Sequence, residues 1–247
     1  MIKYLKQNNK EIMIKIKNSL FLLLLITFIG CGETTQNNQE SIKSETTTTK
    51  EFIVRSNCNQ IIDNEFITIC YDYKLKAAKA VAYTLSGDLI NDKNIKERPR
   101  FYKEPSLEKK YQILHTDYTN SGYDRGHLAP DAAFDWSQES LDAVYTLANI
   151  IPQAPQINRN SWADLEKYTR DKAVELGELK VMNVVKYGQR SRRMGKNRMA
   201  ISKGYFKVLS NQYENYKECF YYSNKLGVSA SGDNVSNHKI NCDSVTN

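Results

Sequence analysis

The residues best suited to chemistry form a short run, Asp124-Arg125-Gly126-His127, within the stretch SGYDRGHLAP at positions 121–130. The chain has only three histidines, and an imidazole with an unperturbed pKa of about 6.5 can act as a general base near neutral pH. Gly126 allows another group to approach the backbone closely. Taken alone, the run is equally compatible with a charged hairpin whose Asp and Arg form a solvated pair.

A second polar set follows about thirty residues later, on the helix predicted for RNSWADLEKYTRDKAVELG, residues 159–177. Asn158 stands at its start, and a rotation of about 100° per residue places Glu166 and Arg170 on the same broad polar face. Because a helix rises about 1.5 Å per residue, Asn158 and Glu166 lie about 12 Å apart along its axis. The two are therefore too distant to ligate one ion directly. As an i,i+4 pair, Glu166 and Arg170 are also compatible with an ordinary solvated helix face.

Together these residues fit the hydrolysis of a phosphodiester. That reaction needs an activated water, neutralisation of the negative charge on the phosphoryl oxygens and stabilisation of the leaving oxygen. His127 can activate the water, arginines such as Arg170 can neutralise the phosphate, and a cation on Asn158 can do the rest.

Two segments of the sequence resemble those of a known protein family. DRGHLAPDA, residues 124–132, is similar to the active-site signature of the DNA/RNA non-specific endonucleases, the sugar-nonspecific nucleases of the ββα-metal superfamily. LANIIPQAPQINRNSWADLEKYTR, residues 147–170, resembles that family's Asn-x-x-Pro-Gln segment, its metal-binding Asn, and the Trp and Glu of its helix. The similarity extends from about residue 71 to about residue 209, most of the expected folded chain.

The resemblance implies roles for the residues around the base and the metal. His127 would be the general base that activates the attacking water. Asn158 would be the direct protein ligand of a divalent cation, usually Mg²⁺, with Mn²⁺ expected to substitute. Glu166 would contact the water shell of that cation, and Asn149 would help to hold the histidine and the cation region.

The resemblance also implies that two arginines contact the scissile phosphate. One is Arg170, and the other lies upstream in RPRFYKEP, residues 98–105, where Arg100 matches best and Arg98 remains the alternative. Asp124 and Arg125 are expected to orient the motif.

A further basic stretch, QRSRRMGKNR at residues 189–198, has five basic residues among the nine from Arg190 to Arg198. Its candidate phosphate-backbone contacts are Arg190, Arg192 and Arg193, and a simple solvated loop is the competing interpretation. The spacing suggests no partner for His115 or His238, so neither is expected to function directly.

The elements that must position these residues indicate an α+β fold, with a mixed or antiparallel sheet, few helices and a ββα-metal motif. Ser137 is expected to cap one short helix. Asn160 or Ser161 is expected to cap the helix of residues 159–177, and Gly177 to end it. NIIPQAPQIN, residues 149–158, is expected to be irregular because it contains Pro152 and Pro155. Strands are predicted at about 65–73, 78–86, 179–188, 204–210 and 218–224.

The N-terminal region indicates export. Lys15 and Lys17 precede an apolar run of about ten residues, which is typical of a signal peptide and short for a membrane span. The run ends at FIGC, which resembles a bacterial lipobox in which Cys31 is lipidated. We therefore expect a signal peptide at 1–30, a disordered polar tether at 31–51 and a nuclease domain at 52–247. Ordinary secretion is the alternative.

Removing residues 1–30 lowers the formal net charge from +7 to +3, so overall charge alone is a weak sign of nucleic-acid binding. Four further cysteines suggest two disulfides in an oxidising compartment. Three pairings are open, and short loops favour Cys58–Cys70 and Cys219–Cys242. A zinc site is the weaker alternative because the spacings do not resemble one.

The sequence thus predicts an exported, lipid-anchored, Mg²⁺-dependent endonuclease that cuts DNA and RNA with little sequence preference. Such a protein would sit at a membrane, or otherwise be periplasmic or secreted. The rival hypothesis is an exported nucleic-acid-binding lipoprotein without cleavage activity.

The lipid anchor is open to a direct test. A Cys31→Ser protein should leave the membrane fraction or remain unprocessed, because the lipidated thiol is lost. Fractionation of cells that express either form measures this. A wild-type protein found wholly soluble outside the cytoplasm would show ordinary secretion instead.

Overall fold

The computed structural model describes residues 57–227 and 232–245. The expected signal peptide, Cys31, the tether and the expected domain start at residue 52 lie outside the described residues. Within the described part of the chain, no helix combines the length and apolar character needed to cross a membrane.

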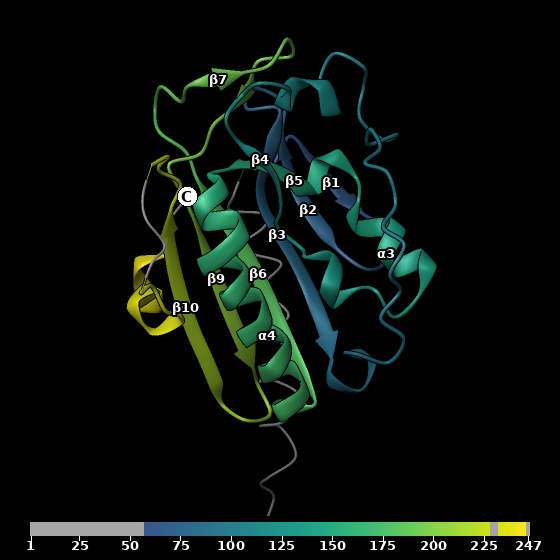
Figure 1. The fold of residues 1–247 in the computed structure, drawn as a ribbon, viewed down its shortest axis with the longest axis vertical. Helices are drawn as coiled ribbons and strands as arrows, with labels where there is room; N and C mark the ends of the chain where they lie inside the picture. The colour runs from purple at the N-terminus through teal and green to yellow at the C-terminus, as the bar shows by residue number, and fades with distance from the viewer. Residues whose placement is uncertain (1–56, 228–231, 246–247) are drawn as a thin grey trace, which may run out of the picture. The chain divides into compact units, whose positions relative to one another are not determined.

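One seven-stranded sheet organises the domain, in the order β1-β2-β3-β6-β9-β10-β11 (Figure 1). Every neighbouring pair in it is antiparallel, which confirms the predicted α+β class with an antiparallel sheet. Its strands are β1 (Gln60–Asp63), β2 (Thr68–Asp72), β3 (Ala77–Ser86), β6 (Glu178–Lys186), β9 (Gly204–Asn211), β10 (Tyr216–Ser223) and β11 (Lys239–Ile240). The five strands predicted from the sequence correspond to β2, β3, β6, β9 and β10.

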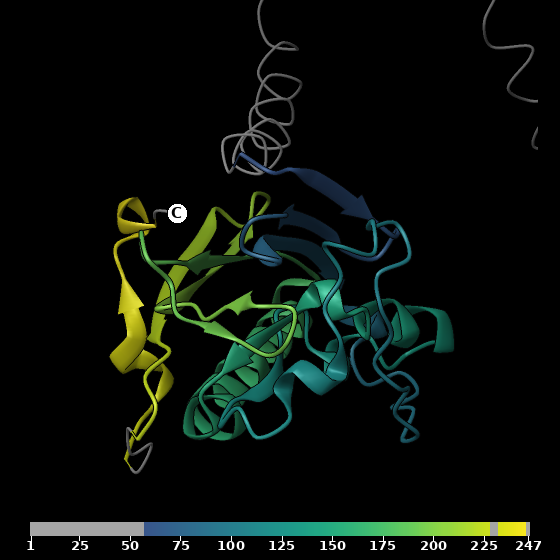
Figure 2. The same cartoon turned by 90° about the horizontal axis from the view of Figure 1, so that it is seen from above.

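Two α-helices, α3 (Gln138–Val144) and α4 (Trp162–Leu176), lie on one face of this sheet (Figures 1 and 2). Ser137 caps α3 as expected, because its side chain accepts a hydrogen bond from the Ser140 amide. The apolar stripe of α4 is buried against the sheet, and Gly177 ends the helix with a left-handed φ of 75°. The main core therefore fills the space between α4 and the sheet.

The start of α4 differs from the prediction. Neither Asn160 nor Ser161 caps the helix, because the chain is already helical there in a π-helical turn, Ile157–Ser161. Helical backbone already begins at Pro155, so Asn158 lies inside the helical segment, as the second residue of the π-helical turn. π-Bulges of this kind recur at functional sites.

A two-stranded ribbon stands apart from the large sheet and consists of β4 (Asp124–His127) and β5 (Ile150–Gln153). The expectation that residues 149–158 are irregular was wrong for β5. Pro152 is accommodated opposite Arg125 because this ribbon leaves one edge of β5 free of a ladder partner. With α4, the ribbon completes a ββα unit.

A second ribbon, β7 (Arg193–Met194) with β8 (Met199–Ala200), holds the basic stretch. It packs through Met194 and Met199 on a smaller core cluster that includes Tyr118 and Ile150. The buried Asp117 side chain accepts hydrogen bonds from the backbone and side-chain nitrogens of Asn197, which fixes the turn of this ribbon.

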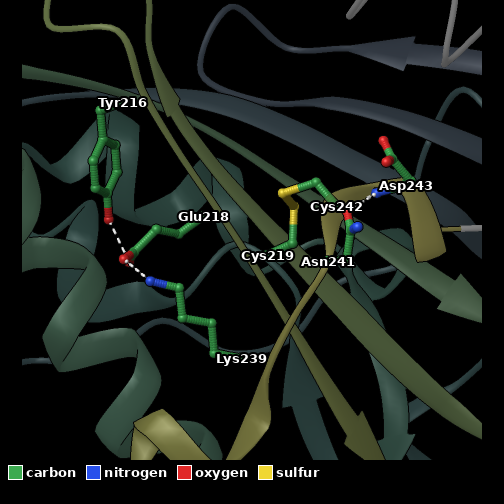
Figure 3. Close-up of a disulfide and its surroundings, with 7 residues drawn as sticks. All are labelled: Tyr216, Glu218, Cys219, Lys239, Asn241, Cys242 and Asp243. Atoms are coloured by element: carbon green, nitrogen blue, oxygen red, sulfur yellow. Dashed lines mark hydrogen bonds and ion pairs between the residues drawn. A yellow bond between two sulfur atoms is a disulfide. The ribbon is translucent and has the colours of Figure 1, made fainter.

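Both favoured disulfides are confirmed: Cys58 pairs with Cys70, and Cys219 with Cys242. The second links β10 to the segment after β11, and Figure 3 shows it beside a small polar group. In that group Glu218 accepts hydrogen bonds from Tyr216 and Lys239 at 2.6 Å each. The C-terminal segment is thus attached to the sheet by a covalent bond and an ion pair.

Replacing both Cys219 and Cys242 by Ser should lower the free energy of unfolding by about 3 kcal/mol, because the open loop regains chain entropy in the unfolded state. Chemical denaturation under non-reducing conditions measures the change. Peptide mapping that links Cys219 to Cys58 or Cys70 would contradict the connectivity.

Candidate active site

His127 is the centre of the candidate site and lies at the end of β4. Its ring packs between Phe101 and Tyr145, with ring centroids 5.5 and 5.0 Å away. Its Nε2 is buried and makes no hydrogen bond with any residue in the described ranges. Burial lowers the pKa of His127 to about 4, assisted by Arg98 and opposed by Asp131. The imidazole is therefore neutral at physiological pH and available to accept a proton.

Asp131, four residues after His127, connects the histidine's surroundings to an arginine. Its carboxylate accepts a hydrogen bond from the Tyr145 hydroxyl at 2.8 Å and lies 3.4 Å from the guanidinium of Arg98. Arg98 also pairs with the buried Asp135 at 3.0 Å. Two carboxylates thus hold Arg98 within electrostatic reach of His127.

Of the two upstream arginines, the structure brings Arg98 to the histidine. Both arginines reach solvent, but the ion pairs to Asp131 and Asp135 are made by Arg98 and not by Arg100, the better match by resemblance. In the free protein, therefore, Arg98 is the upstream arginine that is tied, through Asp131 and Tyr145, to the surroundings of His127.

Asn158 is held by the aspartate of the DRGH run. Its Nδ2 donates to Asp124 at 3.1 Å, and Arg159 donates two hydrogen bonds of 2.7 and 2.8 Å to the same carboxylate. Although burial opposes ionisation, Arg159 and Asn158 hold the pKa of Asp124 below its usual range. Because the Asn158 nitrogen is engaged, its Oδ1 is the atom left to bind a cation.

The donor set fits a weakly held hard cation. Among the described residues, no three His, Cys, Asp or Glu side chains gather in a way that could hold a metal ion. Mg²⁺ prefers oxygen ligands and retains several waters in protein sites. The amide oxygen of Asn158 is a ligand of that kind, and the carboxylate of Asp124 behind it fixes the orientation of the amide.

Three buried asparagines fix the β4–β5 ribbon. Asn149 accepts a hydrogen bond from the Ala129 amide and donates to the carbonyls of Ala129 and Val144, at 2.8 to 3.0 Å. Asn183 on β6 donates to the Leu128 carbonyl at 2.7 Å. Asn224, which follows β10, donates to the Pro152 carbonyl and accepts from the Ala154 amide. The side chain of Asn149 is buried and hydrogen-bonded through both its nitrogen and its oxygen, so it positions the segment that follows the histidine strand.

Gly126 is required by close packing within the ribbon. A Cβ at this position would lie 1.9 to 2.4 Å from side-chain atoms of Gln153, its near neighbour on β5. Gln153 is itself fully buried. The group whose close approach Gly126 permits, as expected from the sequence, is therefore the glutamine side chain.

Glu166 and Arg170 lie on α4 and interact with a residue absent from the sequence prediction, the buried Lys207 of β9. Burial raises the pKa of Glu166, and the charges of Lys207 and Arg170 oppose that rise. Burial lowers the pKa of Lys207, and Glu166 opposes that fall. Strand alternation was the available signal, because Lys207 shares parity with the core residues Tyr205 and Leu209.

The remaining residues considered in the sequence, Arg125 and the other two histidines, lie outside the surroundings of His127 or stabilise the chain next to it. Arg125 donates to the His115 carbonyl and lies over the Tyr118 ring at 5.5 Å, so it braces the segment before β4. His115 is exposed. His238, which had no partner suggested by its spacing, bonds to Asp233 at 2.8 Å and stacks on Tyr222.

The arginines of the basic ribbon are of two kinds, exposed and hydrogen-bonded to the backbone. Arg190 and Arg192 are exposed. Arg193 donates to the carbonyls of Lys74, Leu75 and Arg198, so its guanidinium stabilises the ribbon. The structure therefore leaves Arg190 and Arg192 as the freer candidates for phosphate contact.

The site combines a ββα unit with a neutral histidine and an asparagine whose amide oxygen can bind a cation. This combination is typical of metal-assisted nucleases. The chain belongs to the DNA/RNA non-specific endonuclease family, whose sequence model matches residues 44–247.

Several nucleases are similar in sequence. Mitochondrial endonuclease G of Homo sapiens is 30% identical over 164 residues, covering 61% of this chain and 54% of that protein. The mitochondrial nuclease of Saccharomyces cerevisiae is 34% identical over 108 residues, covering 43% of this chain and 32% of that protein. The chain thus spans about half the length of the endonuclease G relatives it matches.

The fold is also similar to a solved structure, the crystal structure of the EndoG/EndoGI complex, with a TM-score of 0.67 and 20% sequence identity. The match covers 79% of this chain and 86% of that one. This likeness supports the fold.

Asn183→Ala tests the support of the histidine strand. The variant should lower the free energy of unfolding by about 1–3 kcal/mol, because it leaves the buried Leu128 carbonyl unpaired. Urea denaturation measures this, with the exposed Asn237→Ala as the matched control. A change no larger than that of the control would show that Asn183 is not needed to hold the strand.

Proposed function

We propose that this protein is a divalent-metal-dependent endonuclease that hydrolyses the phosphodiester bonds of DNA and RNA with little sequence preference. The observation that carries the proposal is His127, a neutral imidazole with an unpaired Nε2. It lies on the strand whose Asp124 holds the side chain of Asn158. Family membership supports the same chemistry.

In this mechanism His127 takes the proton of the attacking water, which its low pKa allows throughout the neutral range. Arg98 and Arg170 face the phosphoryl oxygens and reduce their negative charge as the bond to the attacking oxygen forms. Asp124 holds the Asn158 side chain so that its Oδ1 is presented to a cation. When bound there, a divalent cation neutralises charge on the phosphate and the leaving oxygen.

The assignment of Mg²⁺ rests on the chemistry of the ligand. A single neutral amide oxygen gives a hard cation little charge compensation, so most of its binding energy comes from water and the substrate phosphate. Mn²⁺ should substitute because it also accepts oxygen ligands. Low sequence preference follows because phosphate contacts carry no sequence information.

We further propose that the protein is exported and anchored by a lipid on Cys31. This rests on the apolar run before Gly30-Cys31 and the polar segment that follows. Two disulfides in the domain are consistent with an oxidising compartment.

His127→Ala should lower the rate of plasmid cleavage by at least about 100-fold, the usual scale for loss of a general base. The exposed His115→Ala is the matched control and should cleave normally. Near-wild-type cleavage by a verified, uncontaminated His127→Ala protein would remove His127 from the mechanism.

The metal site has its own test in the same assay. Brief EDTA treatment should abolish cleavage of DNA and RNA reversibly, and Asn158→Ala should lose cleavage while it retains salt-sensitive DNA binding. Full activity in excess EDTA, or full activity of Asn158→Ala in Mg²⁺, would contradict the metal placement. A wild-type protein that binds both nucleic acids and never cuts would support the rival, a binding lipoprotein.

A further inference from the structure

Arg159 directly follows Asn158 and lies in the same π-helical turn. Its side chain is 68% exposed, yet its position is fixed. Nε and Nη2 donate hydrogen bonds of 2.8 and 2.7 Å to the two carboxylate oxygens of Asp124. Asp124 belongs to β4, and its side chain is only 18% exposed. The guanidinium is therefore anchored on one side to a partly buried acid of the site and is open to solvent on the other.

The pairing with Asp124 leaves part of the guanidinium free. It uses two of the five N–H donors that an arginine side chain carries. Because the guanidinium is planar and rigid, the donors on Nη1 lie on the edge that faces away from Asp124. Among residues 57–227 and 232–245, Asp124 is the only carboxylate in an ion pair with Arg159, and Nη1 has no hydrogen-bond partner. Such an edge is suited to the oxygens of a phosphate.

The position of Arg159 along β4 indicates which phosphate it can meet. Asp124 and His127 are the first and last residues of this strand, about 10 Å apart along its axis. Arg159 is anchored at the Asp124 end, whereas the water that His127 activates attacks at the other end. In the proposed mechanism Arg98 and Arg170 already serve the scissile phosphate. The free edge of Arg159 is therefore placed for a different phosphate of the same nucleic-acid strand.

We propose that Arg159 is a substrate-binding residue whose outer guanidinium edge binds a backbone phosphate that flanks the scissile one. The proposal rests on the proposed nuclease function and adds one contact outside the reacting phosphate. Because phosphate contacts carry no sequence information, Arg159 contributes affinity for DNA and RNA without base preference. Asp124 holds the guanidinium in place before the substrate arrives, which reduces the entropy lost on binding.

Binding without metal tests this contact independently of cleavage. The wild type and Arg159→Gln are titrated with a short labelled DNA duplex in EDTA at several NaCl concentrations, and fluorescence anisotropy gives Kd. Arg159→Gln should bind about 10-fold more weakly at low salt, the scale of one charge-assisted hydrogen bond. The slope of log Kd against log salt should fall by about 0.9, the value for one lost phosphate contact. Arg159→Lys, which keeps the charge, should retain the slope of the wild type.

Lys217→Gln is the matched control for the loss of one exposed positive charge. Lys217 is exposed on β10, and the far end of that strand, Ser223, is followed by Asn224, which bonds to β5. Lys217 and Ser223 are about 20 Å apart along the strand. Lys217→Gln should therefore keep the Kd and the salt slope of the wild type. Urea unfolding should give all three variants the midpoint of the wild type, because each changes an exposed side chain.

Cleavage kinetics in Mg²⁺ separate substrate binding from support of Asp124. A contact to a phosphate that does not react is made equally in the ground state and the transition state. Arg159→Gln should therefore raise KM about 10-fold and leave kcat within about twofold of the wild type. An arginine that only supported Asp124 would instead lower kcat, because Asn158 would lose its orientation, and would leave the salt slope unchanged.

The proposal is overturned by an unchanged Kd and salt slope in Arg159→Gln, by a lower kcat with unchanged KM, or by an equal effect in Lys217→Gln. A salt slope of Arg159→Lys no closer to the wild type than that of Arg159→Gln would also overturn it. Failure of the nuclease assignment is seen separately. A wild type that binds DNA and never cuts would still show the effect of Arg159→Gln on Kd and on the salt slope.

Discussion

The site depends on a constraint of backbone hydrogen bonding. The β4–β5 ribbon carries the histidine but does not join the seven-stranded sheet, so its outward amides and carbonyls have no ladder partner there. The buried amide of Asn224 supplies a partner to the Pro152 carbonyl of β5, and the buried amides of Asn183 and Asn149 bond the carbonyls of Leu128 and Ala129, which directly follow β4. An unpaired buried carbonyl would cost about 1–3 kcal/mol, so these contacts define where the ribbon can lie.

Charge is distributed in the site so that the base remains neutral while the groups around it remain charged. His127 is enclosed by aromatic rings, and its nearest carboxylate, Asp131, is occupied by Tyr145 and Arg98. Asp124, the other acid of the motif, is neutralised by Arg159 and directed toward Asn158. Each carboxylate therefore orients a neighbour, and none hydrogen-bonds to Nε2 of His127. The charge of Asp131 raises the pKa of the imidazole, but burial outweighs it.

Much of this arrangement could be predicted from local patterns. Alternation in the strands, the Ser137 cap and the apolar stripe of α4 reflect short-range physics, and short loops favoured the two disulfides. The prediction was less successful where partners distant in sequence decide the outcome. Pro152 lies in a strand because β5 has a free edge, and the π-helical turn displaces the expected cap. The position of Arg98 depends on Asp131 and Asp135, so it did not follow from spacing. Alternation along β9 did place Lys207 on the core side, but its aromatic neighbour there, Trp162, lies on α4.

The central claim is that the fold maintains His127 as a neutral, unpaired base. Imidazole titration by NMR in the metal-free protein tests this most directly, because the chain has only three histidines and the signal of His127 disappears in His127→Ala. The account predicts that His127 remains neutral at pH 6 and titrates well below its ordinary value, at about 4. Titration at or above about 6.5, the unperturbed value, would contradict it.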